Sequence, residues 1–299
     1  MSDTRLVGVL PVFKERGYTS NDVVAKLRGI LRMKKIGHTG TLDPDAVGVL
    51  PVCLGKATKL VGYLTDTDKT YSCCMRLGVT TDTEDMTGTI TATKDTSDIK
   101  ENDIRDAILS FIGGYDQIPP MYSAKKINGK KLYELAREGK VVERKPAKVF
   151  IRNIDGISVD RDDDTVRVYF TVECSKGTYI RSLCRDIGEA LGVGAAMESL
   201  KRIKAAGIDI SDCMTLSEIE EKTKNDSIKE RLLPIDSFYK EEGRYDADVI
   251  QEKYIRNGNS FVCRGVEDGR YRVYLPDGTF AALYDIKKNE ARLCRYFLG

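Results

Sequence analysis

The sequence predicts an α+β fold with a small β module at the C-terminal end. Helix-like and strand-like stretches are mixed along the chain without the regular strand–helix–strand rhythm of a doubly wound sheet. The last part of the chain, residues 243–299, is strand-like and carries the turn signals Asn257-Gly258, Asp268-Gly269 and Asp277-Gly278. The length of 299 residues corresponds to about two domains. We therefore place a boundary near residues 240–244.

Apolar residues at helical spacing predict three helices. The first is capped by Ser20 or Thr19 and continues to about Lys35. The second covers residues 104–112 and the third covers residues 183–191.

Alternation of apolar and polar residues predicts strands, most clearly over residues 166–172. The alternation is less clean over residues 71–77, 149–154 and 271–275. Between these stretches, the segment 116–146 is rich in lysine and contains two adjacent prolines and a central Asn-Gly pair. We expect this segment to be a mobile loop or an insertion.

Basic residues gather in two segments of a chain that is nearly neutral overall, with 48 Lys and Arg against 46 Asp and Glu. Residues 24–60 carry seven Lys or Arg against two Asp, and residues 124–148 carry nine against three Glu. The balancing acidic residues lie elsewhere, for example in residues 82–106. This distribution is typical of a phosphate-binding face, although a merely solvated surface would give the same pattern.

Several classes of protein are excluded by composition. No apolar run reaches the roughly 18 residues that a membrane helix needs, and the N-terminus shows no secretory signal, so we expect a cytoplasmic protein. The eight cysteines form no C-x-x-C pair, and His38 is the only histidine, which argues against zinc-finger and His-rich metal sites. The thiols should be reduced and mostly buried, so we expect no disulfide.

Residues 37–50 form a distinctive segment with the sequence Gly-His-Thr-Gly-Thr-Leu-Asp-Pro-Asp-Ala-Val-Gly-Val-Leu. Its glycines and Pro44 require a loop. Because Pro44 disfavours helical geometry at the preceding residue, the carboxylate of Asp43 should project from extended backbone. A structural turn in which Asp43 only caps backbone amides is the plainer alternative.

Commoner site motifs do not fit this region. A phosphate-binding P-loop that ends at Gly55-Lys56 would need serine or threonine in place of Ala57. A Ser or Cys nucleophile would have to use His38, which has no orienting signature nearby. A glycosidase would pair Asp43 with Asp45, but neighbouring loop residues rarely straddle one sugar ring.

The segment resembles a signature of the TruB family of tRNA pseudouridine synthases. The resemblance covers residues 5 to about 205, and its long ordered matches make chance agreement implausible. After the loop, the matching blocks are residues 55–59, 68–71, 81–85, 118–124 and 175–181.

The resemblance implies isomerisation of the uridine at position 55 of the tRNA T-loop to pseudouridine. The uracil is detached from the ribose at N1 and rejoined through C5. Such a reaction needs no metal, redox carrier or nucleotide, so no cofactor is expected. The expected partner is the T-arm of tRNA, and the resemblance implies a monomer without an obligate protein partner.

Three residues match the family's catalytic groups: Asp43, Tyr71 and Arg181. A carboxylate near the glycosidic bond can act as nucleophile or base. Arg181 should keep Asp43 ionised and aim it through a planar fork of hydrogen bonds, which lysine could not reproduce. Tyr71 should stack on the flipped-out base, and its hydroxyl is placed to assist proton removal from C5.

The resemblance assigns His38, Tyr179, Leu200 and Lys14, together with Tyr71, to substrate binding. His38 resembles the histidine that enters the RNA loop near the displaced nucleotide. Tyr179 and Leu200 resemble residues that contact the base. Since a tyrosine or leucine on a strand or helix is usually a core residue, that simpler interpretation stays open for Leu200.

The same resemblance divides the chain. Residues 1–242 should form a mixed-sheet catalytic domain, in which residues 116–146 are an insertion that closes on RNA. Residues 243–299 should form a PUA-like, β-barrel-like RNA-binding module. The chain departs from the family beside Lys14, where Phe13 and Glu15 replace its usual Asp and Pro, so the loop geometry and an RNA contact are open at this point.

Two other functions stay open. One is a non-catalytic tRNA-binding or RNA-folding factor that retains the scaffold. The other is a related pseudouridine synthase that acts on another RNA. The joint presence of Asp43, Tyr71 and Arg181 favours catalysis over the first of these.

Overall fold

The computed structural model describes residues 6–123, 125–127, 129–140, 142–162 and 165–298. The strands of the first part of the chain are β1 (Gly8–Lys14), β2 (Ile36–His38), β3 (Val47–Leu54), β4 (Lys69–Leu77), β5 (Val79–Thr81), β6 (Ile90–Thr93), β7 (Gly113–Gln117), β8 (Lys126–Ile127), β9 (Lys130–Lys131), β10 (Ala147–Asp162), β11 (Thr165–Cys174), β12 (Ala195–Ala205) and β13 (Ile208–Asp209). The last five are β14 (Gly243–Asp246), β15 (Phe261–Val262), β16 (Gly269–Tyr274), β17 (Phe280–Lys287) and β18 (Glu290–Tyr296).

The α-helices are α1 (Ser20–Ile30), α2 (Val61–Thr65), α3 (Glu101–Leu109), α4 (Leu132–Arg137), α5 (Ile180–Ala190), α6 (Leu216–Lys224) and α7 (Val249–Arg256). Short 3-10 helices are η1 (Gly55–Leu60), η2 (Ile210–Asp212), η3 (Ile228–Arg231) and η4 (Ile235–Tyr239).

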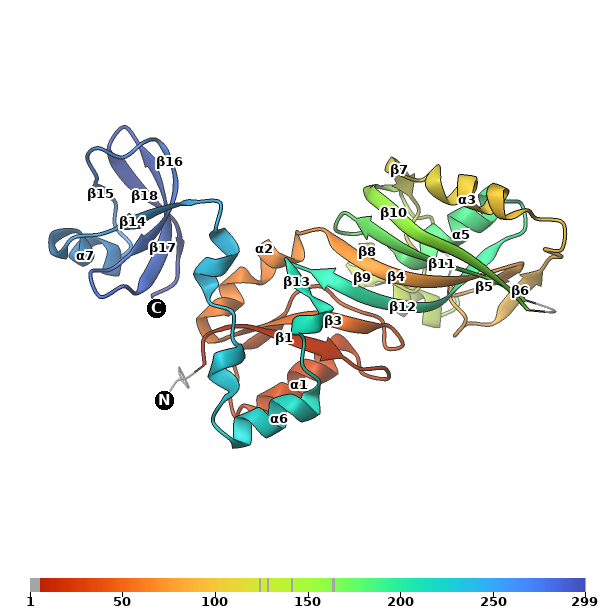
Figure 1. Cartoon of the computed structure of the whole chain (residues 1–299), viewed down its shortest axis with the longest axis horizontal. Helices are drawn as coiled ribbons and strands as arrows, with labels where there is room; N and C mark the ends of the chain where they lie inside the picture. The colour runs from red at the N-terminus through yellow and green to blue at the C-terminus, as the bar shows by residue number, and fades with distance from the viewer. Residues whose placement is uncertain (1–5, 124, 128, 141, 163–164, 299) are drawn as a thin grey trace.

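A mixed nine-stranded sheet forms the centre of the molecule (Figure 1). Its main path is β1-β3-β12-β4-β11-β10-β7, and β2 and β13 pair with β3 and β12. The β3–β12 pair is parallel, and the other pairs are antiparallel. The parallel pair joins a half-sheet around β1 and β3 to a half-sheet around β4, β10 and β11. This architecture confirms the predicted α+β class.

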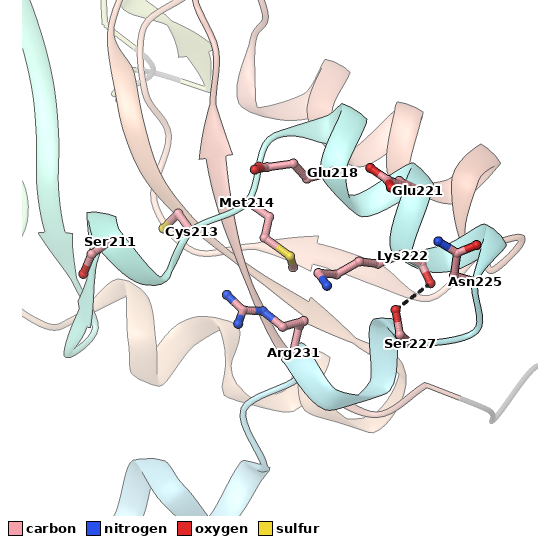
Figure 2. Close-up of a pocket in the computed structure, with 9 residues that line it drawn as sticks. All are labelled: Ser211, Cys213, Met214, Glu218, Glu221, Lys222, Asn225, Ser227 and Arg231. Atoms are coloured by element: carbon pink, nitrogen blue, oxygen red, sulfur yellow. Dashed lines mark hydrogen bonds between the residues drawn. The ribbon is translucent and has the colours of Figure 1, made fainter.

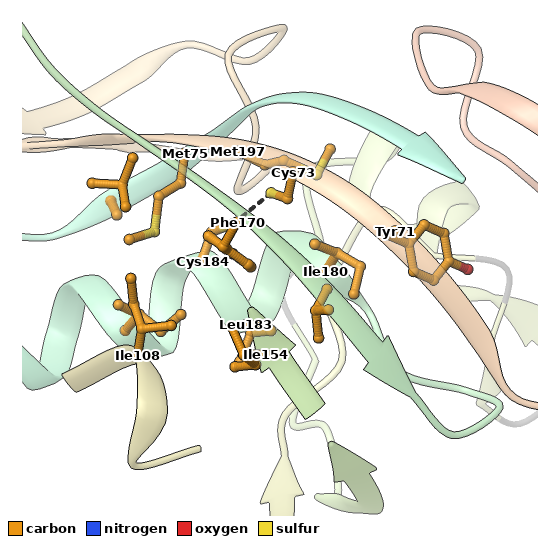
Figure 3. Packing of buried hydrophobic residues seen from close by; sticks show 14 of the residues in the cluster. Tyr71, Cys73, Met75, Ile108, Ile154, Phe170, Ile180, Leu183, Cys184 and Met197 are labelled. Atoms are coloured by element: carbon orange, nitrogen blue, oxygen red, sulfur yellow. Dashed lines mark hydrogen bonds between the residues drawn. The ribbon is translucent and has the colours of Figure 1, made fainter. Parts of the chain in front are cut away.

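Helices cover the two half-sheets separately. α1 and α6 pack on the half around β1 and β3, whereas α3 and α5 pack on the half around β4, β10 and β11 (Figure 1). The second half encloses a cluster that includes Phe170 and Leu183, both buried (Figure 3). β3 is buried on both faces, since Leu50 faces α1 and Val49 faces the opposite cluster. Two buried faces explain the continuous apolar run of this strand.

The predicted helices are present, but the first is shorter than expected, and the second, α3, begins and ends three residues earlier than residues 104–112. Thr19 caps α1 through a capping box with Asp22, and the helix ends at Ile30 instead of near Lys35. Arg32 then adopts a left-handed conformation with φ 51°. The chain leaves the helix here because β2, which starts at Ile36, pairs with β3. The basic residues that follow α1 therefore lie in a connection.

The predicted strands are present, and β10 is longer than its sequence pattern indicated. The alternation ended near residue 154, yet β10 pairs with β11 as far as Asp162. The register shifts twice, between Ile151 and Asn153 and between Asp155 and Ser158. Such bulges interrupt the period of two without ending the strand, which explains why the pattern stopped early.

The segment 116–146 contains local structure in its described residues. A hairpin of β8 and β9 precedes α4, in which Leu132 and Leu135 are buried. Its two ends are tied to each other, because Arg144 Nη1 donates to Pro119 O at 3.0 Å. The predicted mobility of this segment remains a prediction.

The C-terminal residues form a separate five-stranded sheet in the order β14-β16-β17-β18-β15 (Figure 1). This sheet has its own core, in which Val273 and Tyr284 are fully buried. The predicted β module is confirmed, with one correction. Asn257-Gly258 does not turn between strands but ends α7, which packs on this core through Ile255.

The C-terminal sheet is docked on the rest of the chain. Leu283 and Phe297 lie in one apolar cluster with Leu60 and Tyr239. At the edge of this contact, Lys59 Nζ donates to the backbone carbonyl of Tyr296 at 2.8 Å. The two parts are therefore joined by shared core as well as by chain connectivity.

Gly48 allows β3 and β12 to approach closely. Its φ is +112°, and a Cβ there would lie 2.2 Å from the carbonyl oxygen of Arg202. Replacing Gly48 with Ala should lower the free energy of unfolding by at least about 3 kcal/mol, measured by chemical denaturation. Gly207→Ala is the matched control, since Gly207 has φ +74° with open space around it. That change should cost only about 1–2 kcal/mol. Equal losses would contradict the clash.

Candidate active site

The loop between β2 and β3 is fixed on both sides of Asp43. Leu42 N donates to Ser20 Oγ at the start of α1 at 2.9 Å. On the other side, Lys14 Nζ donates to Pro44 O at 3.0 Å. These contacts hold the loop backbone while 43% of the Asp43 side chain stays exposed. The carboxylate is thus both positioned and open to an incoming molecule.

Arg181, near the start of α5, lies beside this carboxylate. Its Nε is 3.1 Å from Asp43 Oδ2, and its Nη2 donates to Asp43 Oδ1 at 3.5 Å. The Arg181 side chain is only 7% exposed. A buried guanidinium therefore holds one side of a carboxylate whose other side faces solvent. The structure brings together these two residues, which are far apart in sequence, in the forked geometry that arginine favours.

Other contacts fix Arg181 itself. Its Nη1 donates to Thr83 O at 3.1 Å, and its Nη2 donates to Tyr122 O at 2.9 Å. Asp85 Oδ2 lies 3.4 Å from Nη1. Because two carboxylates and two carbonyls surround it, the guanidinium cannot turn away without losing several hydrogen bonds. Asp85 was not singled out from the sequence as a functional residue.

The electrostatic balance at Asp43 is mixed. Burial raises the pKa of Asp43 above its ordinary value, and the neighbouring Arg181 guanidinium opposes this rise. The negative charge of Asp85 raises the pKa of Asp43 further. Arg181 thus favours the ionised form, as expected, but does not cancel the effect of burial.

Removing the charge of Asp85 should extend activity to lower pH. Asp85→Asn takes away a charge that raises the pKa of Asp43, so the ionised form of Asp43 persists further into acid. We expect the acidic limb of the pH profile of the single-turnover rate to move to lower pH. Asp82→Asn is the control, because Asp82 bonds Thr89 N in the same loop. An acidic limb that moves upward in Asp85→Asn would refute this account.

Tyr71 lies near the start of β4 at the edge of the core. It is 8% exposed and packs in the cluster that includes Leu42 and Ala46. Figure 3 shows its hydroxyl pointing away from the other buried side chains. Burial raises the pKa of Tyr71, Arg202 lowers it, and the charge of Asp43 raises it again. The phenol is therefore within electrostatic reach of the Asp43 carboxylate.

Tyr179 and Leu200 flank these groups. Tyr179 is the N-cap residue of α5, and its backbone is hydrogen-bonded to the buried side-chain amide of Gln117. Tyr179 N donates to Gln117 Oε1 at 2.8 Å, and Gln117 Nε2 donates to Tyr179 O at 3.0 Å. Leu200 pairs with Cys73 on β4 and packs partly buried against the Tyr71 cluster. Gln117 is a further positioning residue that the sequence pattern did not reveal.

His38 lies on β2 and is half-buried. Its Nδ1 is buried and has no hydrogen-bond partner among the described residues. Burial and the positive charge of Arg202 lower the pKa of His38, which favours the neutral ring.

Lys14 lies beneath the loop rather than on its surface. It is fully buried, and its ammonium donates to the backbone carbonyls of Glu15, Tyr18 and Pro44. Burial lowers the pKa of Lys14 to about 8. This geometry supports a role in fixing Pro44 rather than in contacting substrate. Since Glu15 contributes its carbonyl, the side chain that replaces the family's proline leaves this anchor intact.

All eight cysteines are free thiols, and six of them are buried. Cys73 and Cys184 lie behind Tyr71 with their sulfur atoms 3.6 Å apart (Figure 3). In the described part of the chain, no group of three or more His, Cys, Asp or Glu side chains could hold a metal ion. A search of the described helices found none with the length and apolar character to cross a membrane.

A cavity of about 440 Å³ lies away from Asp43 (Figure 2). It is formed by η2, α6, η3 and the segments between them, and Lys222 and Arg231 point into it alongside acidic residues such as Glu218. None of the predicted site residues lines it. The exposed carboxylate and its partners therefore form a site separate from this cavity.

Two solved structures have the same fold. One is a chain in the "Structure of H/ACA RNP bound to a substrate RNA containing 2'-deoxyuridine", with a TM-score of 0.70 and 23% identity, covering 98% of this chain and 86% of that one. The other is in the "Crystal Structure of a Cbf5-Nop10-Gar1 Complex", with a TM-score of 0.70 and 24% identity, covering 97% and 85%. At this identity they support the fold alone.

Family models and close relatives agree with each other. The model "TruB family pseudouridylate synthase (N terminal domain)" matches residues 28–180, and "tRNA pseudouridylate synthase B C-terminal domain" matches residues 181–240. Proteins named tRNA pseudouridine synthase B are similar over most of their length. That of Staphylococcus saprophyticus is 52% identical over 77% of this chain and 76% of the relative. That of Lachnoclostridium phytofermentans is 47% identical over 97% and 99%. This chain therefore belongs to the TruB family of pseudouridylate synthases.

Proposed function

We propose that this chain converts the uridine at position 55 of the tRNA T-loop to pseudouridine. The observation that carries the proposal is the half-exposed Asp43 carboxylate, held by the buried guanidinium of Arg181 with Tyr71 nearby. The names of the relatives, tRNA pseudouridine synthase B, support tRNA as the substrate.

The reaction exchanges one bond of the base for another. The N1–C1′ bond breaks, the C5–C1′ bond forms, C5 loses its proton and N1 gains one, so the product is an isomer. Asp43 acts as the nucleophile or base at the glycosidic bond. Arg181 keeps its carboxylate aimed through both hydrogen bonds. Tyr71 relays the proton from C5: its oxygen accepts that proton as its own hydroxyl proton passes to water, and the electron pair of the C5–H bond returns to the ring.

Base flipping gives the site access to a nucleotide inside a folded loop. The Tyr71 ring lies at the edge of the core, where it can stack on an extruded base, and such stacking contributes about 1–3 kcal/mol. Leu200 packs beside it. His38 is half-buried, and a neutral imidazole has one donor and one acceptor with which to bond the RNA loop.

The remaining parts of the chain are assigned by the same proposal. Residues 1–242 form the catalytic domain, residues 116–146 close on the RNA, and residues 243–299 bind it as a PUA-like module. The base of residues 116–146 reaches the site, because Tyr122 O accepts a hydrogen bond from Arg181. The enzyme acts as a cytoplasmic monomer without an added cofactor.

The test is incubation of the purified chain with unmodified tRNA and no additives. The RNA is then treated with a carbodiimide that leaves a stable adduct on pseudouridine, and the adduct is mapped by primer extension. A new stop at position 55 is expected, and a tRNA with cytidine at this position should give none. Binding without any stop would instead favour a non-catalytic RNA-binding factor. Stops only in other cellular RNAs would favour a synthase of different specificity.

A further inference from the structure

Arg202, on β12, is a buried cation that the proposed reaction does not yet use. It is 1% exposed, and no carboxylate of the described residues lies within salt-bridge distance of it. An unpaired buried charge is costly, so other polar groups must satisfy it.

Two backbone carbonyls satisfy part of the guanidinium. Arg202 Nε donates to Val49 O at 2.7 Å, and Nη2 donates to Gly40 O at 3.1 Å. Gly40 belongs to the same loop as Asp43, and Val49 follows that loop on β3. Arg202 therefore ties the catalytic loop to the centre of the sheet. Arginine has five N–H donors, so these two bonds leave others free to donate.

The Tyr71 side chain is the next neighbour of the guanidinium. Arg202 and Tyr71 are directly opposite each other in the antiparallel β12–β4 pair, so their side chains share a face. Burial raises the pKa of Tyr71, and the positive charge of Arg202 opposes this rise, as expected for a guanidinium close to the phenol. Because arginine can only donate, a hydrogen bond between the two groups requires the Tyr71 oxygen to accept and its own proton to turn elsewhere.

Two neighbouring buried cations show that this arrangement is specific. Lys14 and Lys69 also lie under the loop and bond backbone carbonyls, Lys69 those of Thr65 and Thr67. Arg202 is the one of these three cations that lies directly opposite Tyr71 in the register of β12 with β4. The planar fork of a guanidinium can reach two carbonyls and a phenol at once, which an ammonium cannot match in direction.

We infer that Arg202 is a positioning residue, which holds the Tyr71 oxygen as an acceptor facing the flipped base while it anchors the catalytic loop at Gly40. This role rests on the proposed function. It predicts that loss of the guanidinium slows the removal of the proton from C5 specifically, since that is the step in which the Tyr71 oxygen takes part.

The test is the single-turnover rate of Arg202→Met on T-arm RNA with hydrogen or deuterium at C5 of the target uridine. The rate should fall about 10–100-fold, the range for losing a hydrogen bond to a charged group. The deuterium isotope effect should exceed that of the wild-type chain, while RNA affinity changes by less than about threefold. Lys69→Met is the matched control, because it removes a buried cation that does not bond the phenol. Its isotope effect should equal the wild-type value.

Combination with Tyr71→Phe separates positioning from general weakening. If Arg202 acts through the hydroxyl, Arg202→Met no longer changes the isotope effect once the hydroxyl is gone, although loss of the Gly40 contact still slows the reaction. A further rise of the isotope effect in the double variant would overturn the inference, as would an unchanged isotope effect in Arg202→Met. Arg202→Lys serves as a milder variant that keeps the charge but loses the fork, and it should show the same rise in isotope effect.

A measurement on the unaltered arginine covers the case in which both variants fail to fold. The guanidinium NMR signals of Arg202 should move in Tyr71→Phe, which removes one oxygen atom. Unmoved signals would show that the two groups do not interact, and would overturn the inference. This measurement needs no activity. A wild-type chain that forms no pseudouridine would therefore refute the proposed function without being confused with failure of the Arg202 role.

Discussion

Replacing Asp43 with Asn should abolish pseudouridine formation in T-arm RNA, with a loss of at least about 10⁴-fold in single-turnover rate. The amide keeps the shape of the side chain but can act neither as nucleophile nor as base. The loop positions Asp43, and the loop backbone does not depend on the Asp43 carboxylate. RNA affinity should therefore stay within about tenfold of wild type. Rate and affinity are measured by carbodiimide mapping and by filter binding on the same RNA.

Asp45→Asn provides the matched control for this loss. Asp45 is exposed in the same loop two residues later, so its removal changes the local charge by the same amount. Its activity should stay within about tenfold of wild type, as expected for an exposed charge. Full activity in Asp43→Asn would refute the catalytic assignment.

Replacing Arg181 with Lys should reduce the rate by about 10²–10³-fold, since a positioned donor to a reacting carboxylate contributes on this scale. The ammonium cannot reach Asp43, Asp85 and the two carbonyls in the planes that the guanidinium uses. The weaker contact also removes part of the effect that lowers the pKa of Asp43. Activity needs ionised Asp43, so the acidic limb of the rate should move to higher pH, opposite to its movement in Asp85→Asn.

Arg185→Lys tests whether another, partly buried arginine of α5 gives this result. Arg185 lies one turn further along the helix and pairs with Glu84 and Asp186 instead of Asp43. It should alter stability while leaving the acidic limb in place. An equal shift in both variants would mean that Arg181 acts through the helix rather than directly on Asp43.

The sequence allowed the loop and its central carboxylate to be predicted because their cause is local. Glycines and Pro44 set the backbone, whereas Tyr71 and Arg181 were assigned to the same site only by the resemblance to the TruB family. The α+β class was predictable for the same reason, from periodicity and turn residues. The end of α1 and the extension of β10 were not, because the first depends on pairing of β2 with β3 and the second on bulges against β11.

The supporting residues of the site could not be predicted because they act from distant parts of the chain. Asp85 reaches Arg181 from a different loop, and Arg202 meets Tyr71 only through the register of β12 with β4. Lys14 was expected at the substrate, whereas its burial supports a role beneath the loop. Residue type and spacing show which functional groups one segment contains. They do not show which buried charged side chain will lie opposite that segment across a sheet.

The apolar seam around Leu60, Tyr239, Leu283 and Phe297 limits how the C-terminal part can behave. A chain cut after Glu242 would leave half of that seam facing water, so the remainder would tend to aggregate instead of surviving as an independent enzyme. The seam also restricts rotation of the C-terminal sheet relative to the rest of the chain. An RNA that touches both parts must fit a spacing that is already set in the free protein. The protein would therefore select RNAs in which the two contacted regions lie at that spacing.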